Sequence, residues 1–181
     1  RHTTATVLFT GESGTGKDVA ARSLHRLTFG PRAGSAPYVA FNCAAVPPEM
    51  FEAELFGAER GAYTGAERRR SGLVEAAQSG TFFLDEIGET PLPLQAKLLR
   101  FLEAREFRSL GGTGSQAFTG RFVAATNKAL RARNRAAAYL GLVPSTRQSA
   151  AHCYHGRTTN QGPRHARGMR AYGTKVVGGV T

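Results

Sequence analysis

The sequence predicts an α/β fold in which helices flank a parallel sheet. From about residue 5 to 130, short apolar runs alternate with segments of helical periodicity. A glycine-rich turn follows the first apolar run, and two acidic residues follow the third. Strands that alternate with helices are joined by right-handed crossovers, which make neighbouring strands parallel.

Four apolar runs are the predicted strands, and four further segments are the predicted helices. The strands span Val7–Thr10 and residues 38–41, 81–84 and 121–125. Residues 81–84 carry Phe82, Phe83 and Leu84 in succession, which is typical of a strand covered on both faces. The helices span residues 17–28, Pro48–Phe56, 71–77 and 91–103.

Two of these helices carry apolar positions that predict which side faces the core. In the first, Ala20, Leu24 and Leu27 recur at helical spacing. In the last, Thr90 is the expected N-cap and Pro91 the first helical residue. Its apolar stripe consists of Leu94, Leu98, Phe101 and Leu102.

The positive charge of the chain is concentrated towards its end. The net charge is +11, and all 13 acidic residues lie within residues 1–130 together with 15 of the 24 Lys and Arg. Residues 131–181 hold the other nine basic residues and no acid, and they show no sustained periodicity. We therefore assign this tail no structure, and its charge says little about the partners of residues 1–130.

Composition also indicates in which compartment the protein is expected. No stretch approaches the roughly 18 apolar residues of a membrane span, and no secretory signal is visible. Two cysteines, Cys43 and Cys153, favour a reduced, cytoplasmic setting without a disulfide framework. The chain opens almost directly on an apolar run and lacks an initiator Met, so we expect a piece of a longer protein.

The glycine-rich turn is a candidate phosphate-binding loop. Its residues are Gly11, Glu12, Ser13, Gly14, Thr15, Gly16 and Lys17, which fit the pattern G-x-x-x-x-G-K between a strand and a helix. Glycines let backbone N–H groups point at phosphates, and Lys17 is expected to reach the β- and γ-phosphates. The next residue is Asp18, where most such loops place Ser or Thr on Mg²⁺.

An acidic pair, Asp85 and Glu86, follows the third strand. Beside a phosphate loop, Asp85 is expected to hold Mg²⁺ through water and Glu86 to act as general base on the attacking water. We expect this strand to lie next to the strand of the phosphate loop, because ligands bind at the carboxyl ends of parallel strands. Taken alone, the pair is equally consistent with two solvated carboxylates.

Two asparagines follow the second and fourth strands at the same expected edge. Asn42 is placed to hydrogen-bond Glu86, and Asn127, with Thr126, to sense the γ-phosphate. The alternative is that both asparagines cap turns, as Asn often does. The residues alone leave both interpretations open.

A further loop places an aromatic ring between glycines and is flanked by charged residues. It consists of Gly61, Ala62, Tyr63, Thr64, Gly65 and Ala66. An apolar ring on a polar-flanked loop suggests contact with a partner. The alternative is a turn whose Tyr63 packs into the core.

In these motifs the chain resembles the central ATPase domain of bacterial sigma-54-dependent transcription activators. GAYTGA at residues 61–66 is similar to the GAFTGA loop of that family, with Tyr63 in place of Phe. NCAA at 42–45, ELFG at 54–57, LDEIG at 84–88 and AATN at 124–127 are similar to the family in the same order. An acidic residue at position 18 is also common there, and the likeness covers roughly residues 5–130.

The resemblance implies an AAA+ type P-loop NTPase that binds ATP and Mg²⁺ and assembles as a homo-oligomer, usually a hexameric ring. It implies that loop 61–66 engages sigma-54 and that hydrolysis remodels the closed complex of the sigma-54 RNA polymerase holoenzyme. Within the site, Asn42 is the implied switch for Glu86, and Thr126 with Asn127 the first sensor. Residues 108–112 match the position of a second loop, and DNA contact is expected only through a domain absent from this sequence.

The resemblance ends after Asn127 and Lys128. Neither the arginine-finger segment nor the helical lid of the family is recognisable beyond this point, so we expect impaired turnover. A nucleotide-binding fragment without turnover is therefore the alternative function, and nucleic-acid binding by the basic tail is a third.

We thus predict a partial AAA+ domain at residues 1–130 and a basic tail at residues 131–181. A shifted reading frame near residues 128–135 explains the break, and a divergent or disordered tail is the rival explanation. Translating the encoding DNA in its other frames beyond codon 128 distinguishes them.

Overall fold

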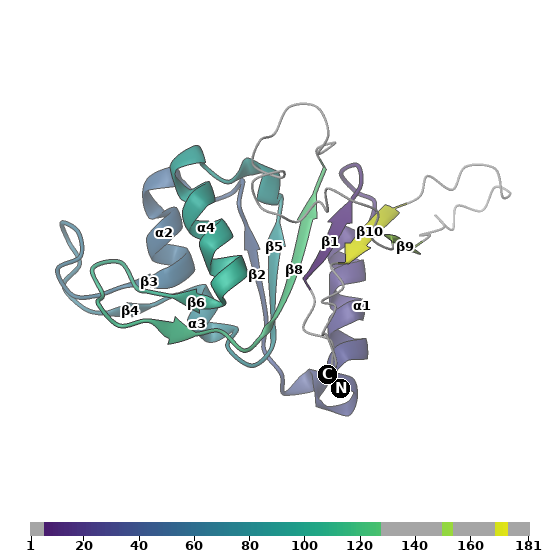
Figure 1. Ribbon diagram of the computed structural model, residues 1–181, viewed down its shortest axis with the longest axis horizontal. Helices are drawn as coiled ribbons and strands as arrows, with labels where there is room; N and C mark the ends of the chain where they lie inside the picture. The colour runs from purple at the N-terminus through teal and green to yellow at the C-terminus, as the bar shows by residue number, and fades with distance from the viewer. Residues whose placement is uncertain (1–5, 128–149, 154–168, 174–181) are drawn as a thin grey trace, which may run out of the picture.

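The computed structural model describes residues 6–127, 150–153 and 169–173. Within them, six strands form one sheet in the order β2-β5-β8-β1-β10-β9 (Figure 1). The strands are β1 Val7–Thr10, β2 Tyr38–Asn42, β5 Thr81–Asp85, β8 Arg121–Thr126, β9 Ala150–Cys153 and β10 Met169–Gly173. The first four are parallel to one another, whereas β10 runs antiparallel to β1, and β9 antiparallel to β10.

The structure confirms the four predicted strands and the predicted α/β class. Three of them, β2, β5 and β8, continue one residue beyond the predicted end, to Asn42, Asp85 and Thr126. These three polar residues were expected just after the strands, and in the structure each is the last residue of its strand.

The predicted neighbour of the phosphate-loop strand is wrong. Strand β8 lies between β1 and β5, so the strand that ends in Asp85 does not pair with the strand that precedes Gly11. The motifs do not reveal this order, because any order of parallel strands brings their carboxyl ends to one edge. The ammonium of Lys17 nevertheless lies within ion-pairing distance of Glu86, as described below.

Two helical layers cover the sheet, one on each face (Figure 1). Helix α1, Lys17–Phe29, packs on one face, and α2, Pro48–Phe56, with α4, Leu92–Ala104, on the other. Alternate residues of β5 divide between the layers: Phe82 and Leu84 join the α2–α4 core, and Phe83 the α1 core. All three are at most 1% exposed, which confirms a strand covered on both faces.

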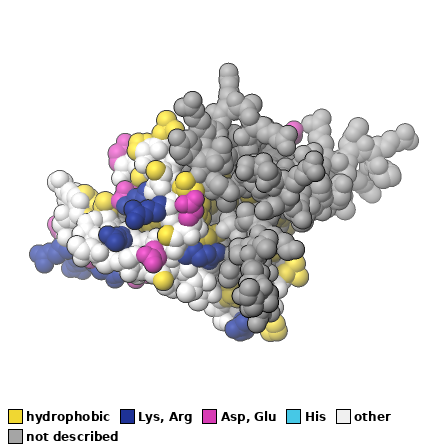
Figure 2. Space-filling model, viewed as in Figure 1, with side chains coloured by type: hydrophobic (Ala, Val, Ile, Leu, Met, Phe, Trp, Pro, Cys, Tyr) yellow, Lys and Arg dark blue, Asp and Glu magenta, His cyan; other side chains and the backbone are white. Residues whose placement is uncertain are grey.

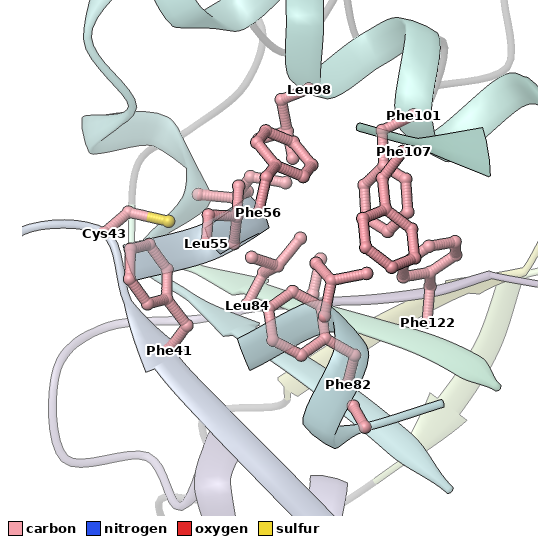
Figure 3. Close-up of a cluster of buried hydrophobic side chains, with 14 of the residues drawn as sticks. Phe41, Cys43, Leu55, Phe56, Phe82, Leu84, Leu98, Phe101, Phe107 and Phe122 are labelled. Atoms are coloured by element: carbon pink, nitrogen blue, oxygen red, sulfur yellow. The ribbon is translucent and has the colours of Figure 1, made fainter. Parts of the chain in front are cut away.

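Aromatic rings tie α4 to the sheet and to the outer hairpins. The Phe101 ring lies 4.9 Å from that of Phe122 on β8 and 5.4 Å from that of Phe56 on α2, measured between centroids. Figure 3 shows Phe101, Phe107 and Phe122 between α4 and the sheet, and the Phe101 ring meets the other two edge to face, at interplanar angles of 79° and 88°. Edge-to-face contacts of this kind add to the free energy gained from burying each ring.

The predicted face of the first helix is partly wrong. Leu27 is 83% exposed, and the buried positions of α1 are Lys17, Ala21 and His25, spaced four residues apart. Ala20 and Leu24 are half-buried beside this row. The apolar periodicity predicted the wrong face because two of the three buried residues are a lysine and a histidine, which such a pattern does not include.

Helix α4 begins at Leu92, and the predicted N-cap Thr90 is wrong by one position. Pro91 is the N-cap, while the Thr90 hydroxyl donates to the Ile87 carbonyl oxygen at 2.8 Å. Thr90 precedes a proline and adopts extended ψ, as steric contact with the proline ring favours. The predicted stripe is confirmed, with Leu98 and Phe101 buried and its other two members packed against the core.

Short elements complete the described part of the chain. Strands β3, Gly57–Ala58, and β4, Arg70–Ser71, pair below loop 59–69, and β6, Glu106–Phe107, pairs with β7, Gln116–Ala117. Helix α3 spans Leu73–Ala76, shorter than the predicted 71–77 because Ser71 belongs to β4. Two 3₁₀ turns, η1 Gly30–Gly34 and η2 Ile87–Glu89, follow α1 and β5.

The basic tail contributes two strands that its composition did not predict. Strand β10 pairs with β1 from Val7 opposite Gly173 to Thr10 opposite Arg170, and β9 pairs with the other side of β10. Strands of four or five residues without strong apolar alternation give no clear signal in sequence. The remaining residues from 128 onward, including the predicted break at 128–135, lie outside the described residues.

Candidate functional site

The carboxyl ends of four parallel strands bring the predicted site residues to one edge of the sheet. In the register, Thr10 is opposite Thr126, and Asn42 is opposite Asp85. The turns after β1, β5 and β8 therefore leave the sheet side by side. Parallel α/β sheets bind their ligands at this edge.

The glycine-rich turn after β1 has the backbone that its sequence predicts. Gly14 and Gly16 have φ of +78° and +84°, a region that favours glycine, and Gly16 is the N-cap of α1. A side chain at Gly11 would place its Cβ 2.8 Å from the Thr15 hydroxyl oxygen, so the turn admits no Cβ there without a shift. Glu12 and Ser13 are exposed on the outside of the turn.

Lys17 is held inside this turn. Its side chain is 7% exposed, and Nζ donates to the carbonyl oxygens of Gly11 and Glu12, each at 3.0 Å. The same Nζ lies 3.9 Å from Glu86 Oε1. The ammonium group is therefore at the centre of the loop, within ion-pairing distance of the second acidic residue.

Glu86 is fixed from several sides. Its Oε2 accepts a hydrogen bond from the backbone N–H of Asn127 at 2.9 Å, and its own N–H donates to Asp85 Oδ1 at 3.0 Å. Its backbone is left-handed, with φ 50° and ψ 47°, which costs roughly 1–2 kcal/mol for a residue with a Cβ. Only Arg105 shares a positive φ among the described residues other than glycine, and such strain is typical of functional sites.

The end of β8 connects the two halves of the edge. The Thr126 carbonyl oxygen accepts from the Gly11 N–H at 3.2 Å, and the next residue, Asn127, holds Glu86 through its own N–H. Thr126 itself is fully buried. The structure thus brings Lys17, Glu86 and Asn127 together. The sequence predicted a hydrogen bond to Glu86 from Asn42, but the bond that Glu86 accepts comes from the backbone N–H of Asn127.

Asp18 stands where most phosphate loops have a hydroxyl. Its Oδ2 accepts from Arg22 Nε at 3.1 Å, an ion pair one turn apart on the exposed side of α1. Among the described residues, no cluster of three or more His, Cys, Asp or Glu has the arrangement of a metal site.

Asn42 forms a turn. Its Oδ1 accepts from the Ala44 N–H at 2.9 Å, the short-range contact of an Asx turn. The next residue, Cys43, is buried, and its N–H donates to the Asp85 carbonyl oxygen at 2.9 Å. Burial, with smaller contributions from the carboxylates of Asp85 and Glu86, raises the pKa of the Cys43 thiol to about 12, so the thiol stays neutral at neutral pH.

The loop with the aromatic ring lies between β3 and β4 and projects away from the six-stranded sheet (Figure 1). Tyr63 is 45% exposed, so the alternative in which it packs into the core is wrong. The loop is closed at its base, where the Gly61 N–H donates to the Ala66 carbonyl oxygen at 2.8 Å and Ala66 is buried. Thr64 and Gly65 are exposed at the tip, and Ala62 is half-buried.

Ion pairs and a neighbouring loop support the base of this loop. Arg69 Nη2 lies 3.1 Å from Glu75 Oε2, and its Nε 3.4 Å from Glu59 Oε1. In loop 108–112, the Leu110 N–H donates to the Gly57 carbonyl oxygen at 2.8 Å, and its carbonyl oxygen accepts from the Glu59 N–H at 2.9 Å. The two loops therefore share backbone hydrogen bonds.

Sequence reasoning missed two features of the site. One is the hydrogen bond from the backbone N–H of Asn127, which any residue other than proline could donate. The other is the left-handed backbone of Glu86, since positive φ is usually signalled by Gly, Asn or Asp. The ion pairs of Arg69 have a weak signal, since oppositely charged residues flank the GAYTGA segment on both sides.

Comparison with known proteins agrees with these motifs. The sigma-54 interaction domain family matches residues 1–139, beyond the predicted boundary near residue 130. The regulatory protein AtoC of Escherichia coli strain K12 is 52% identical over 128 residues, which are 71% of this chain and 27% of AtoC. The transcriptional regulator NtrC of Azospirillum brasilense is 51% identical over 129 residues, 71% of this chain and 26% of NtrC.

Solved structures agree as well. The crystal structure of NtrX from Brucella abortus superposes with a TM-score of 0.62 and 34% identity, covering 71% of this chain and 27% of NtrX. NtrX has also been crystallised with ADP and with ATP.

The chain spans about a quarter of the length of these relatives. In the described part of the chain, no helix has the length and apolar character needed to cross a membrane. The match over residues 1–139 and the identity to these regulators place the chain in the sigma-54 interaction domain family, the AAA+ domain of sigma-54-dependent transcriptional regulators.

Proposed function

We propose that this domain binds ATP with Mg²⁺ at the edge formed by Gly11–Lys17, Asp85–Glu86 and Thr126–Asn127, and that hydrolysis drives remodelling of the sigma-54 RNA polymerase closed complex. One observation carries the proposal. Lys17, Glu86 and Asn127 come from three separate motifs, yet Nζ of Lys17 and N of Asn127 both contact the Glu86 carboxylate, at 3.9 and 2.9 Å. A shared catalytic site is the simplest reason for this convergence.

The residues suit the binding of a triphosphate. The N-terminus of α1, which Gly16 caps, and the Lys17 ammonium inside the glycine turn both favour an anion. The phosphates replace the carbonyl oxygens of Gly11 and Glu12 as partners of Lys17 Nζ. The ATP and ADP complexes of NtrX, a relative with the same fold, support this assignment.

Glu86 is the proposed general base. Its carboxylate accepts the proton of the attacking water once the contacts from Lys17 and Asn127 release it. Asp85 is the residue proposed to hold Mg²⁺ through water, since the ion, when bound, neutralises charge on the phosphates. Asn42 remains the proposed switch for Glu86, and this role requires it to leave the Asx turn to Ala44.

The exposed loop 61–66 is the proposed contact for sigma-54. Its ring is presented to solvent on a base closed by the bond from Gly61 to Ala66. An exposed aromatic ring on a supported loop is the kind of group that anchors a protein interface. In the complete protein we propose a homo-oligomeric ring, with DNA bound through a separate domain.

The decisive test compares Glu86→Gln with the parent chain in ATP binding and ATP hydrolysis. Gln keeps the size and polarity of the side chain but is not a base, so hydrolysis should fall by about 100-fold or more while ATP affinity stays within a few-fold. An equal loss of both would show that Glu86 serves binding or folding and that another group is the base.

A second candidate function is nucleotide binding without turnover. It is favoured by the sequence after Asn127 and Lys128, where the arginine-finger pattern of the family is not recognisable. Retention of ATP by the parent chain with no release of phosphate would support this candidate over the first. Full-length AtoC, assayed under the same conditions, is the reference for the comparison.

The partner assignment has its own test. Tyr63→Ala should leave ATP binding unchanged and abolish capture of sigma-54 in the ATP-bound state. Thr119→Ala, an exposed substitution on the β7–β8 connection, is the control. Capture of sigma-54 by the Tyr63 variant at the parent level would remove the loop from the proposed interface.

A further inference from the structure

A second hollow lies outside the nucleotide edge. It measures about 590 Å³, within the roughly 300–1,000 Å³ of ligand pockets, and is bordered by α2, α4 and loop 108–112. Phe56, Phe101 and Phe107 line its apolar part. None of the residues that line it belongs to the phosphate loop or to the acidic pair.

Cationic side chains line the same hollow. Arg100 and Arg108 are exposed, and neither has an ion-pair or hydrogen-bond partner among the described residues. Lys97 differs, because its ammonium pairs with Glu52 and lies over the Phe56 ring. Figure 2 shows Lys and Arg side chains next to Asp and Glu side chains over α4 and the neighbouring β6.

The hollow continues to the base of the aromatic loop. A neighbouring hollow of about 310 Å³ shares Ser109, Gly111 and Gly112 with it and reaches Glu59, just before loop 61–66. At Gly111 a Cβ would lie 3.0 Å from Ala62 Cβ, so loop 108–112 is packed directly against the aromatic loop. We refer to these two adjoining hollows, which lie between α4 and the base of the aromatic loop and share part of loop 108–112, as the groove.

We infer that this groove binds an acidic peptide segment of the sigma-54 polymerase that also carries an apolar side chain. The inference rests on the proposed function, which supplies the partner. Guanidinium groups pair with carboxylates in a planar two-bond geometry, and Arg100 and Arg108 are the groups available for it. The apolar side chain fills the space beside Phe56 and Phe101, while Tyr63 contacts the same partner further along.

The lining argues against nucleic acid as the occupant. Glu52, Glu59 and Glu106 border the two hollows. A phosphate backbone carries charge at every nucleotide and would meet these carboxylates along its path. A peptide with one or two acidic residues satisfies the two free guanidinium groups and avoids the carboxylates.

The test uses short overlapping peptides that cover the sigma-54 sequence, titrated with the full chain in fluorescence anisotropy. We expect the peptides that bind to combine Asp or Glu with Leu, Ile or Phe. The double variant Arg100→Glu with Arg108→Glu should lower their affinity about tenfold, equivalent to about 1.4 kcal/mol. Ala104→Trp, which fills the hollow and leaves both arginines in place, should also weaken binding.

A matched control separates local contact from overall charge. Arg26→Glu with Arg32→Glu makes the same charge change at two exposed arginines on α1 and η1, and it should leave affinity within about twofold. Equal losses in both double variants, binding by peptides without acidic residues, or no peptide binding at all would each overturn the groove proposal. Capture of intact sigma-54 by the parent chain with ATP, lost in Tyr63→Ala, would meanwhile leave the proposed function standing.

Discussion

Two regions of this domain are held in place in different ways: the sheet edge with Gly11–Lys17, Asp85–Glu86 and Thr126–Asn127, called the nucleotide edge, and the aromatic loop 61–66. At the edge, Lys17 is buried and bonded to main-chain oxygens, and Glu86 is fixed by the end of a central strand. In the loop, Tyr63 is exposed, and the support comes from a closed base and from ion pairs of Arg69 on the surface. The edge is positioned by the sheet, whereas the loop is positioned by its contacts with loop 108–112, and this difference predicts how each responds to substitution.

The largest expected effect comes from Phe101, in the core between α4 and the sheet. Phe101 is 2% exposed and contacts rings on α2, β6 and β8, so Phe101→Ala should cost about 3–5 kcal/mol of unfolding free energy. Chemical denaturation of the variant and the parent measures this loss. A cost below about 1 kcal/mol would mean that the ring contacts of Phe101 contribute little to the stability of this core.

Lys17→Ala breaks the edge alone. Loss of a buried cation that faces the proposed phosphates should reduce ATP affinity and hydrolysis by about 100- to 1,000-fold. The surroundings of the aromatic loop should not change, so Tyr63 should be as accessible to chemical modification in this variant as in the parent chain. Arg26→Ala, an exposed residue of the same helix, is the control, and a similar loss in that variant would point to damage to α1 as a whole.

Gly111→Ala disturbs the loop alone. The residue has φ +75°, and a Cβ would lie 3.0 Å from Ala62 Cβ, so we expect a loss of about 1–2 kcal/mol in stability. Sigma-54 capture should weaken while ATP affinity is retained. Gly114→Ala is the matched control, because a Cβ there meets no atom within 4 Å. Equal behaviour of the two variants would contradict a packed contact between the loops.

The smallest effect concerns the backbone of Glu86. Both Glu86→Ala and Glu86→Gly remove the carboxylate, but only glycine relieves the left-handed backbone at φ 50°. The glycine variant should therefore be about 1 kcal/mol more stable than the alanine variant, measured by thermal unfolding. If alanine were as stable as glycine, the left-handed backbone would not be strained in the folded chain.

The same contrast explains what the sequence could reveal. The glycine turn and the acidic pair are local patterns with fixed spacing, so their place on strand ends was predictable from Gly11–Lys17 and Asp85–Glu86. The position of β8 between β1 and β5 was not, because strand order depends on contacts between distant segments. The buried face of α1 was missed for a related reason, since His25 and Lys17 are buried through partners that no periodic pattern displays.

The loop shows the limit of residue patterns more clearly. An aromatic ring between glycines is compatible with a buried or an exposed position, and only the structure places Tyr63 in solvent. The resemblance predicted that residues 108–112 form a second loop, but its hydrogen bonds to Gly57 and Glu59 involve backbone atoms that every residue has. The two unexpected strands of the tail, β9 and β10, are too short and too weakly patterned to be predicted.

The central place of β8 has a thermodynamic consequence. One peptide unit, between Thr126 and Asn127, accepts a hydrogen bond from the Gly11 N–H through its oxygen and donates one to the Glu86 carboxylate through its N–H. A ligand that strengthens either bond at the expense of the other changes both, and linkage makes the coupling equal in the two directions. How tightly the phosphate loop holds its ligand and how tightly the Glu86 carboxylate is held would then depend on one equilibrium. A substitution that changes the first property would therefore also change the second.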